Sequence, residues 1–200
     1  MDRKIILGTD CSFRNLGWCI CEVKRKNGTK LSIVDKGIEH INSKVIKKQN
    51  KSLKDLKDCL LLADKLSEVI DKPYNIPSSV ELIWAFEIPV GSQSARAARL
   101  LGMTTGIIAG AITELKKYRE EFSPTIKLTV RIVKPSEVKN KVGNRKATKH
   151  DIMNYINKKY NNIGSDYPNS KFEHIADAIV IAEVALDQEE NKSEDSKITM

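Results

Sequence analysis

The segment 80–88 constrains the fold more than any other part of the sequence. It is rich in apolar and aromatic residues and stops at Pro89-Val90-Gly91. A strand with apolar side chains on both faces must be buried on both faces, as strands of a parallel sheet are. The segment therefore predicts an α/β protein in which helices pack on both faces of a sheet.

Four further segments have the character of strands. Segments 4–10, 17–24 and 31–38 come first, and Asn27-Gly28 between the last two favours a tight hairpin because both residues tolerate positive φ. These three strands are expected to form an antiparallel meander. Segment 128–133 predicts a fifth strand. The expected sheet is therefore mixed, with three antiparallel and two parallel strands.

Helical periodicity marks the segments between and after these strands. A first helix is expected to end at Pro73 and Pro77, a second to run from Ser92 or Ser94 to about Glu121, and two more to cover 150–160 and 173–186. The apolar positions that predict the buried face of the first helix are Leu53, Leu56, Leu60, Ala63, Leu66 and Ile70.

Three glycines lie four residues apart on one face of the second helix: Gly102, Gly106 and Gly110. A glycine inside a helix costs about 1 kcal/mol relative to alanine, so a stripe of three implies the close approach of another backbone. That backbone belongs either to the sheet or to a second subunit.

Charge and length limit the function further. The 200 residues carry 34 Lys and Arg against 26 Asp and Glu, a net charge of +8. Segment 187–200 holds five acids and two lysines, hence −3, which leaves +11 for residues 1–186. We expect one domain over 1–186 and an acidic, disordered tail over 187–200. A basic body favours a polyanionic partner, although an excess of charge also serves solubility.

Compartment and redox state follow from what the sequence lacks. No apolar run approaches the roughly 18 residues that span a bilayer, and the apolar block near the N-terminus is too short for a secretory signal. The expected location is the cytoplasm, with no membrane partner. The four cysteines show neither a C-x-x-C pair nor a downstream histidine pair, which favours reduced, buried thiols over a metal site or disulfides.

Three carboxylates stand in or at the end of apolar segments. Asp10 ends the first strand, Glu87 ends the fourth, and Asp177 interrupts the last helix. Each alone has an ordinary explanation, as a turn residue, a strand end that reaches solvent, or an acid near a helix N-terminus. If the two strands are neighbours and the helix crosses their edge, the three converge where solvent is scarce. Such carboxylates need a hard cation such as Mg²⁺ to neutralise them.

A pair of such ions would suit phosphodiester hydrolysis. Two metal ions about 3.5–4 Å apart stabilise both the attacking and the leaving oxygen of that reaction. His174 lies three residues before Asp177 and shares its helix face, where it can bind a metal or relay a proton. A lone histidine is more often structural.

These motifs resemble those of RuvC-type Holliday junction resolvases, members of the RNase H-like superfamily. Ile6-Leu7-Gly8-Thr9-Asp10, with Gly17 seven residues later, is similar to the first-strand motif of that family. The other matching blocks follow in the family's order and cover most of 4–186: the strand ending at Glu87, the helix with Gly102 and Gly106, Val138-Lys139, Gly143, Ala147-Thr148-Lys149, and His174-Ile175-Ala176-Asp177-Ala178.

The resemblance implies an RNase H-like fold and a set of site residues. Asp10, Glu87, Asp177 and His174 become catalytic residues that hold two Mg²⁺ ions, with Mn²⁺ as an alternative ion. Lys149 falls near the scissile phosphate and Lys139 on DNA, with Arg145 and Lys146 as further DNA contacts. The ordinary interpretation of these basic residues is a solvated surface.

The resemblance also implies an activity. It predicts a Mg²⁺-dependent endonuclease that resolves four-way junctions and related branched DNA by paired nicks leaving 5′-phosphates. Two symmetric nicks call for a homodimer, and the Gly102, Gly106 and Gly110 face is the expected interface. The alternatives are an RNase H-like nuclease for flaps, forks or RNA–DNA hybrids, and a catalytically silent junction-binding protein. Segment 8–12 also resembles the phosphate-binding turn of actin-like kinases, but such kinases repeat the domain and this chain shows no repeat.

Some positions depart from the family pattern. Cys11-Ser12 replaces the Pro-Gly pair of some cellular members, and Val90 stands where the bacterial enzyme has an aromatic residue. The lysine-rich segment 44–57 and the acidic tail also differ from the cellular enzyme. These departures favour a viral or phage member acting in the host cytoplasm.

Overall fold

The computed structural model describes residues 3–25, 28–43, 50–75, 80–88, 94–122, 127–191 and 197–199. Its sheet contains β1 (Arg3–Cys11), β2 (Asn15–Lys24), β3 (Lys30–His40), β4 (Val80–Glu87), β5 (Lys127–Val133) and β6 (Lys197–Thr199). The helices are α1 (Lys51–Asp71), α2 (Ala95–Phe122), α3 (Pro135–Lys141), α4 (Lys149–Lys159) and α5 (Asn169–Glu190), with a 3₁₀ turn η1 (Lys72–Asn75) after α1.

The sheet has the order β3-β2-β1-β4-β5-β6. β1, β2 and β3 pair antiparallel, and β4 and β5 extend the sheet parallel to β1. The mixed sheet of three antiparallel and two parallel strands is therefore confirmed. A sixth strand is added, because β6 pairs antiparallel with the outer edge of β5.

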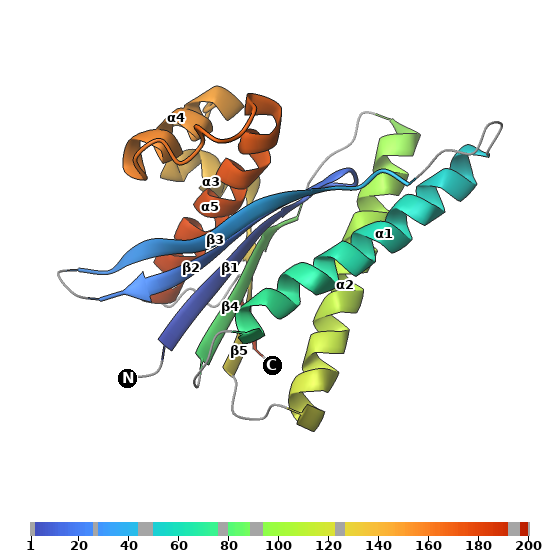
Figure 1. The fold of residues 1–200 in the computed structure, drawn as a ribbon, viewed down its shortest axis with the longest axis horizontal. Coiled ribbons are helices and arrows are strands. Elements are labelled where there is room, and N and C mark those ends of the chain that lie inside the picture. Colours follow the sequence, from blue (N-terminus) through green and yellow to red (C-terminus); the bar gives the residue numbers. More distant parts are fainter. Residues whose placement is uncertain are drawn as a thin grey trace.

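Helices cover both faces of the sheet (Figure 1). α3, α4 and α5 lie on one face, and α1 and α2 lie on the other. β4 divides its side chains between the two cores, with Ile83 and Ala85 facing α5 and Leu82, Trp84 and Phe86 facing α1 and α2. This confirms that the apolar segment 80–88 is a strand buried on both faces.

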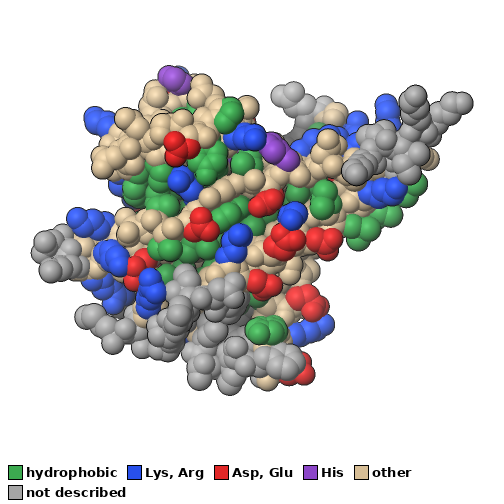
Figure 2. Space-filling view, in the orientation of Figure 1, with side chains coloured by type: hydrophobic (Ala, Val, Ile, Leu, Met, Phe, Trp, Pro, Cys, Tyr) green, Lys and Arg blue, Asp and Glu red, His purple; other side chains and the backbone are tan. Residues whose placement is uncertain are grey.

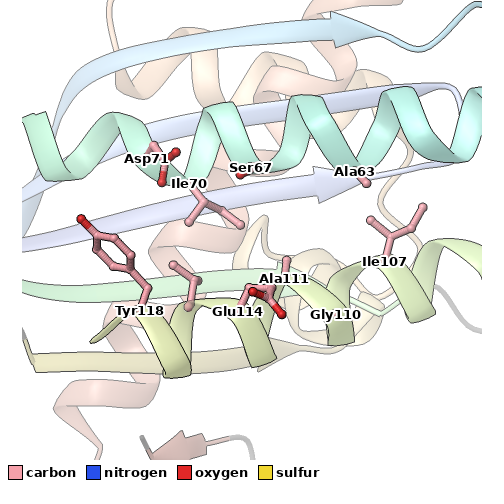
Figure 3. Close-up of a pocket in the computed structure, with 10 residues that line it drawn as sticks. Ala63, Ser67, Ile70, Asp71, Ile107, Gly110, Ala111, Glu114 and Tyr118 are labelled. Carbon is pink, nitrogen blue, oxygen red and sulfur yellow. The ribbon is translucent and has the colours of Figure 1, made fainter. Parts of the chain in front are cut away.

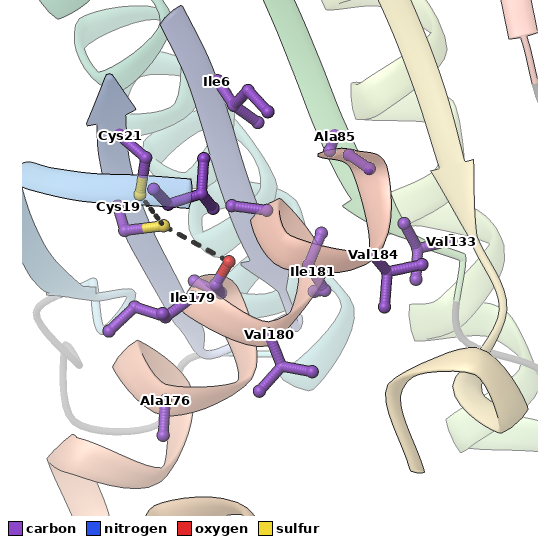
Figure 4. Close-up of a cluster of buried hydrophobic side chains, with 14 of the residues drawn as sticks. Ile6, Cys19, Cys21, Ala85, Val133, Ala176, Ile179, Val180, Ile181 and Val184 are labelled. Carbon is purple, nitrogen blue, oxygen red and sulfur yellow. Dashed lines mark hydrogen bonds between the residues drawn. The ribbon is translucent and has the colours of Figure 1, made fainter. Parts of the chain in front are cut away.

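The core beneath α5 contains two of the cysteines (Figure 4). Cys19 donates a hydrogen bond to the Ala178 carbonyl oxygen at 3.3 Å, and the Cys21 thiol donates to Cys19 at 3.8 Å. All four cysteines are free and buried. The thiols therefore pack as small apolar groups, as the sequence predicts.

The buried face of α1 agrees with the predicted one in its second half only. Leu66 and Ile70 are buried as predicted, whereas Leu53, Leu56 and Leu60 are 47%, 50% and 60% exposed, and in Figure 2 apolar side chains line the outer edge of this helix. The side chains that α1 buries are Asp55, Asp58, Cys59, Leu62, Leu66, Val69 and Ile70. Near its start, α1 thus turns Asp55 instead of the leucines towards α2, where Arg96 and Arg99 bind its carboxylate.

The C-terminal part of the chain also differs from the expectation of a disordered tail after residue 186. α5 begins at Asn169 and continues through Glu190, and β6 pairs with β5. Glu189 in this extension forms salt bridges with Arg131 and Lys4. Residues 192–196 lie outside the described residues.

The starts of α3 and α2 differ in how well the sequence predicted them. The sequence reasoning missed α3, although a proline at its first position and Glu137 at its third are ordinary signals of a helix start. Ser94 accepts a hydrogen bond from the Ala97 amide and so caps α2 as predicted.

The remaining predicted boundary residues Asn27, Pro77 and Ser92 lie outside the described residues, and so do Val90 and 44–49. No helix in the described ranges is long and apolar enough to cross a membrane.

Candidate active site

Two carboxylates leave the same edge of the sheet. Asp10 precedes the last residue of β1, and Glu87 is the last residue of β4. The two strands pair in parallel, with Thr9 opposite Phe86, so the next residue of each strand stands at the same level. The topology therefore places Asp10 and Glu87 at neighbouring positions, as the sequence predicts.

A buried threonine fixes this edge of the two strands. The Thr9 hydroxyl accepts a hydrogen bond from Trp84 Nε1 at 3.1 Å and donates to the Ala85 carbonyl oxygen at 3.4 Å. Thr9 and Trp84 are both completely buried. These bonds restrict the backbone that carries Asp10 and Glu87.

Two glycines let α5 approach the sheet closely. A Cβ on Gly8 would lie 2.2 Å from a backbone oxygen of α5, and a Cβ on Gly17 would lie 2.2 Å from the His174 carbonyl oxygen. Any larger residue would push the helix outwards. The absence of side chains here is what brings His174 and Asp177 to Asp10.

The imidazole of His174 is held on both sides. Its Nδ1 lies 2.7 Å from Asp10 Oδ2, and its Nε2 lies 3.0 Å from Asn15 Nδ2. The Glu173 carboxylate is 3.5 Å from Nε2. His174 is only 8% exposed, so the ring is buried between these groups.

The carboxylates of the site repel one another. Burial raises the pKa of Glu87 to about 7, and the negative charge of Asp10 adds to this, while Lys139 opposes it. Burial and Asp10 likewise raise the pKa of Asp177 to about 7, against the opposing effect of Lys149. The site therefore has more negative charge than its basic residues neutralise.

Lys149 lies close enough to the carboxylates of the site to interact with their charges. It is the first residue of α4, whose start is fixed by the side chain of Thr148. Its Nζ binds Glu173 Oε1 at 2.9 Å. Burial opposes the charged form, but Glu173, Asp177 and Asp10 outweigh it and raise the pKa of Lys149. A permanent positive charge thus faces the carboxylates.

The other predicted basic residues lie on α3 and in the turn that follows it. Lys139 lies on α3, exposed, and acts on Glu87 through its charge. Arg145 and Lys146 are exposed in the turn between α3 and α4. On the face shown in Figure 2, Lys and Arg side chains are interspersed with Asp and Glu, so the described part of that face carries no single basic patch.

The predicted glycine face does not belong to this site. Gly102, Gly106 and Gly110 lie on α2, on the opposite face of the sheet from α5, and are exposed. A Cβ on any of them would meet no described atom within 4 Å. The sheet is therefore excluded as their close partner among the described residues.

Sequence reasoning missed Asn15 and Glu173, which both contact or face His174. Glu173 carried a weak signal, because it directly precedes His174 in the last motif. Asn15 carried almost none, since a polar residue at the start of a strand is common.

The donor set of the site suits a hard cation. Carboxylate oxygens are the ligands that Mg²⁺ prefers, and the excess negative charge at Glu87 and Asp177 would be relieved by one. Within the described ranges, no three His, Cys, Asp or Glu side chains are already placed to hold an ion. The residues therefore fit Mg²⁺ in chemistry, and binding requires the carboxylates to draw together.

Comparisons with known proteins agree with the fold. No family model matches the sequence, and no curated protein matches it. A structure of Thermus thermophilus RuvC is similar to this chain over 98% of its length and 99% of its own, with a TM-score of 0.64 and 16% identity. A second structure, T. thermophilus RuvC in complex with a Holliday junction substrate, is similar over 97% and 99%, with a TM-score of 0.62 and 14% identity.

A third similar structure comes from yeast. The mitochondrial Holliday junction resolvase Ydc2 is similar over 90% of this chain and 77% of its own, with a TM-score of 0.56 and 13% identity. These likenesses confirm the RuvC-type, RNase H-like fold that the motifs indicated.

Proposed function

We propose that this chain is a DNA endonuclease that resolves four-way junctions and related branched DNA. The observation that carries the proposal is the gathering of Asp10, Glu87 and Asp177 at one sheet edge, with Lys149 facing them. The likeness in fold to RuvC structures, one of which holds a Holliday junction substrate, supports the class of substrate.

The chain's own residues divide the work of hydrolysis. Asp10, Glu87 and Asp177, with His174, would hold two Mg²⁺ ions, or Mn²⁺ in their place. When bound, such ions activate the attacking water and stabilise the leaving oxygen of a phosphodiester, which yields a 5′-phosphate when the 3′ oxygen departs. Lys149, whose charge interacts with Asp177 and Asp10, would bind an oxygen of the scissile phosphate and so orient it.

Affinity for DNA would come from basic residues around this edge. Lys139, Arg145 and Lys146 are exposed on α3 and on the turn that follows it. Contacts of such side chains with phosphates position a duplex without reading its sequence. We assign these three residues to the backbone of the DNA.

Paired nicks require two active sites, and we propose a homodimer that uses α2. The Gly102, Gly106 and Gly110 face is exposed and has room for another backbone. Beside it, α1 and α2 enclose a groove of about 670 Å³ (Figure 3), whose floor includes Ile70 and Leu115 and whose lining includes Gly110. Gly106→Arg is expected to convert a dimer into a monomer in sedimentation experiments, whereas a monomeric wild-type protein would contradict this interface.

The central experiment is cleavage of a synthetic four-way junction with Mg²⁺. Asp10→Asn and Glu87→Gln are each expected to slow cleavage by about 10³-fold, the equivalent of about 4 kcal/mol of transition-state stabilisation. Glu81→Gln is the matched control, because Glu81 lies on the same strand as Glu87 but at its other end, where it binds Lys4 and Lys127. Unchanged cutting by either site variant would refute the mechanism.

A panel of substrates separates this function from its alternatives. Faster cutting of flaps, forks or RNA–DNA hybrids than of the junction would identify a broader nuclease. Binding of the junction without any cutting by the wild-type protein would identify a silent junction-binding protein.

A further inference from the structure

A line of hydrogen-bonded side chains leads from the surface of β3 to Asp10. His40 Nδ1 lies 2.8 Å from Asn15 Oδ1, and Asn15 Nδ2 lies 3.0 Å from His174 Nε2. His174 Nδ1 lies 2.7 Å from Asp10 Oδ2. Four side chains from three strands and one helix are thus connected in sequence.

These contacts hold the His174 ring from two sides. The Asn15 side-chain amide contacts Nε2, and Nδ1 faces the Asp10 carboxylate and the site. His40 contacts the other end of the Asn15 amide and so restricts which way that amide faces.

The fold places Asn15 independently of the catalytic carboxylates. Asn15 stands opposite His40 in the pairing of β2 with β3. The Ser12 hydroxyl donates to the backbone carbonyl oxygen of Asn15 at 2.8 Å and accepts from the backbone amide of Asn15 at 3.1 Å. Glu173, which also faces His174 Nε2, is farther away at 3.5 Å and is already bound by Lys149. Asn15 is therefore the group that controls this side of the ring.

We propose that Asn15, held by His40, is a positioning residue that fixes the His174 ring against Asp10. The inference rests on the proposed function, since it assigns a task to the surroundings of that same site. Groups that orient the inner residues of a metal site change metal affinity or activity by about 10–100-fold when removed.

Four variants and two controls test the proposal. Asn15→Leu keeps the approximate shape and removes both hydrogen bonds, and His40→Phe keeps a ring without a donor. His40→Gln restores a hydrogen-bond donor at this position, so it is expected to restore the properties that His40→Phe loses. Asn154→Leu and His150→Phe are the matched controls, because both residues are exposed on α4. Asn15→Gln, which is one methylene longer, tests how closely the amide must be placed.

The first readouts are metal binding and cleavage. Asn15→Leu is expected to weaken Mn²⁺ binding, measured by calorimetry without DNA, and to slow single-turnover cleavage by about 10–100-fold. Its junction affinity in EDTA should stay unchanged, as should its circular dichroism. His40→Phe should act in the same direction by a smaller factor, and His40→Gln should approach the wild type.

The second readout is the ring itself. The chain has only three histidines, so their ring nitrogens can be assigned by nuclear magnetic resonance from single substitutions. In the metal-free wild type, the His174 ring nitrogens are expected to give one set of signals, because contacts on two sides hold the ring in one orientation. Asn15→Leu should shift these signals, whereas Asn154→Leu should leave them unchanged.

Wild-type ring signals and wild-type Mn²⁺ affinity in a folded Asn15→Leu protein would overturn the proposal. If Asn15→Leu does not fold, His40→Phe decides, because unchanged ring signals there would show that the line of hydrogen bonds has no effect. A wild-type protein that cuts no branched DNA would refute the proposed function, while the ring signals would still decide the role of Asn15.

Discussion

Glu87 and Asp177 give the metal-free protein a particular dependence of stability on pH. Their pKa values are raised from 4.5 and 3.8 to about 7 by burial and by Asp10. The folded state therefore holds protons that the unfolded state has released, and stability is lost as the pH rises through about 7. We expect the melting temperature in EDTA to fall between pH 5.5 and pH 8.5.

A comparison of variants isolates the contribution of Glu87 from that of every other titratable group. The Gln side chain of Glu87→Gln has no proton to release and gains no charge as the pH rises, so its melting temperature should fall less than that of the wild type over the same interval. Mg²⁺ should raise the melting temperature of the wild type more at pH 8.5 than at pH 5.5. Parallel pH profiles for the two proteins would contradict the raised pKa of Glu87.

Individual residues differ in how far the sequence predicted their positions. The gathering of Asp10, Glu87 and Asp177 at one end of the strands could be predicted because each stands in or at the end of an apolar segment. Asn15 and His40 break no pattern. The contact of His40 with Asn15 depends on the register of β2 with β3, and the contact of Asn15 with His174 depends on the height of α5 above the sheet. Neither quantity is local in the sequence.

At the scale of elements, the approach of α5 to the sheet is the feature on which the site depends most. Gly8→Ala and Gly17→Ala would each place a Cβ 2.2 Å from a backbone oxygen of α5. We expect each to destabilise the protein by about 1–3 kcal/mol or more, as overpacking does, and to slow cleavage by displacing the helix that carries His174. Denaturation in urea measures the first effect and single-turnover kinetics the second.

The control for these glycines is an exposed position on α4. Asn154→Ala is expected to change the free energy of unfolding by less than about 1 kcal/mol, because only helix propensity differs there. Equal effects of alanine at Gly17 and Asn154 would show that α5 does not rest on the strands as closely as described.

The elements themselves were predictable to different degrees. Strands buried on both faces, such as β4, carry a pattern that admits one interpretation. The buried face of α1 was predicted correctly at Leu66 and Ile70 and wrongly at the three leucines nearer its start. There Asp55 is buried instead, since its carboxylate binds Arg96 and Arg99, some forty residues away in the sequence. The extension of α5 beyond Leu186 escaped prediction for a similar reason, since the partners of Glu189 lie on β1 and β5.

For the molecule as a whole, the order of the motifs predicted more than any one of them. Each block is short, and identity to the similar structures is only 13–16%. The first-strand motif, the second carboxylate and the final helix are far apart in the sequence, but the fold brings them together, because β1 and β4 are neighbours and α5 crosses their edge. The order and spacing of the motifs therefore indicated the fold where overall identity is low.

The distribution of charge predicts that binding and cutting can be separated. The body of the chain, residues 1–186, carries +11, so junction binding is expected in EDTA, with cutting only after Mg²⁺ is added. Since each neutralised phosphate releases counterions, six to ten phosphate contacts would weaken binding by about 10³-fold or more between 50 and 200 mM salt. Fluorescence anisotropy with a labelled four-way junction measures this slope, and a linear duplex of the same sequences is the control.

Substitution of the basic residues assigns that slope to the surface around the active site. Lys139→Ala and Lys146→Ala should each reduce the slope by about one phosphate contact and weaken binding to junction and duplex alike, because backbone contacts carry no sequence information. Lys57→Ala, on α1 across the sheet, should leave it unchanged. Binding that requires Mg²⁺, or that is insensitive to salt, would show that the carboxylates dominate the approach of DNA and that the surrounding lysines do not.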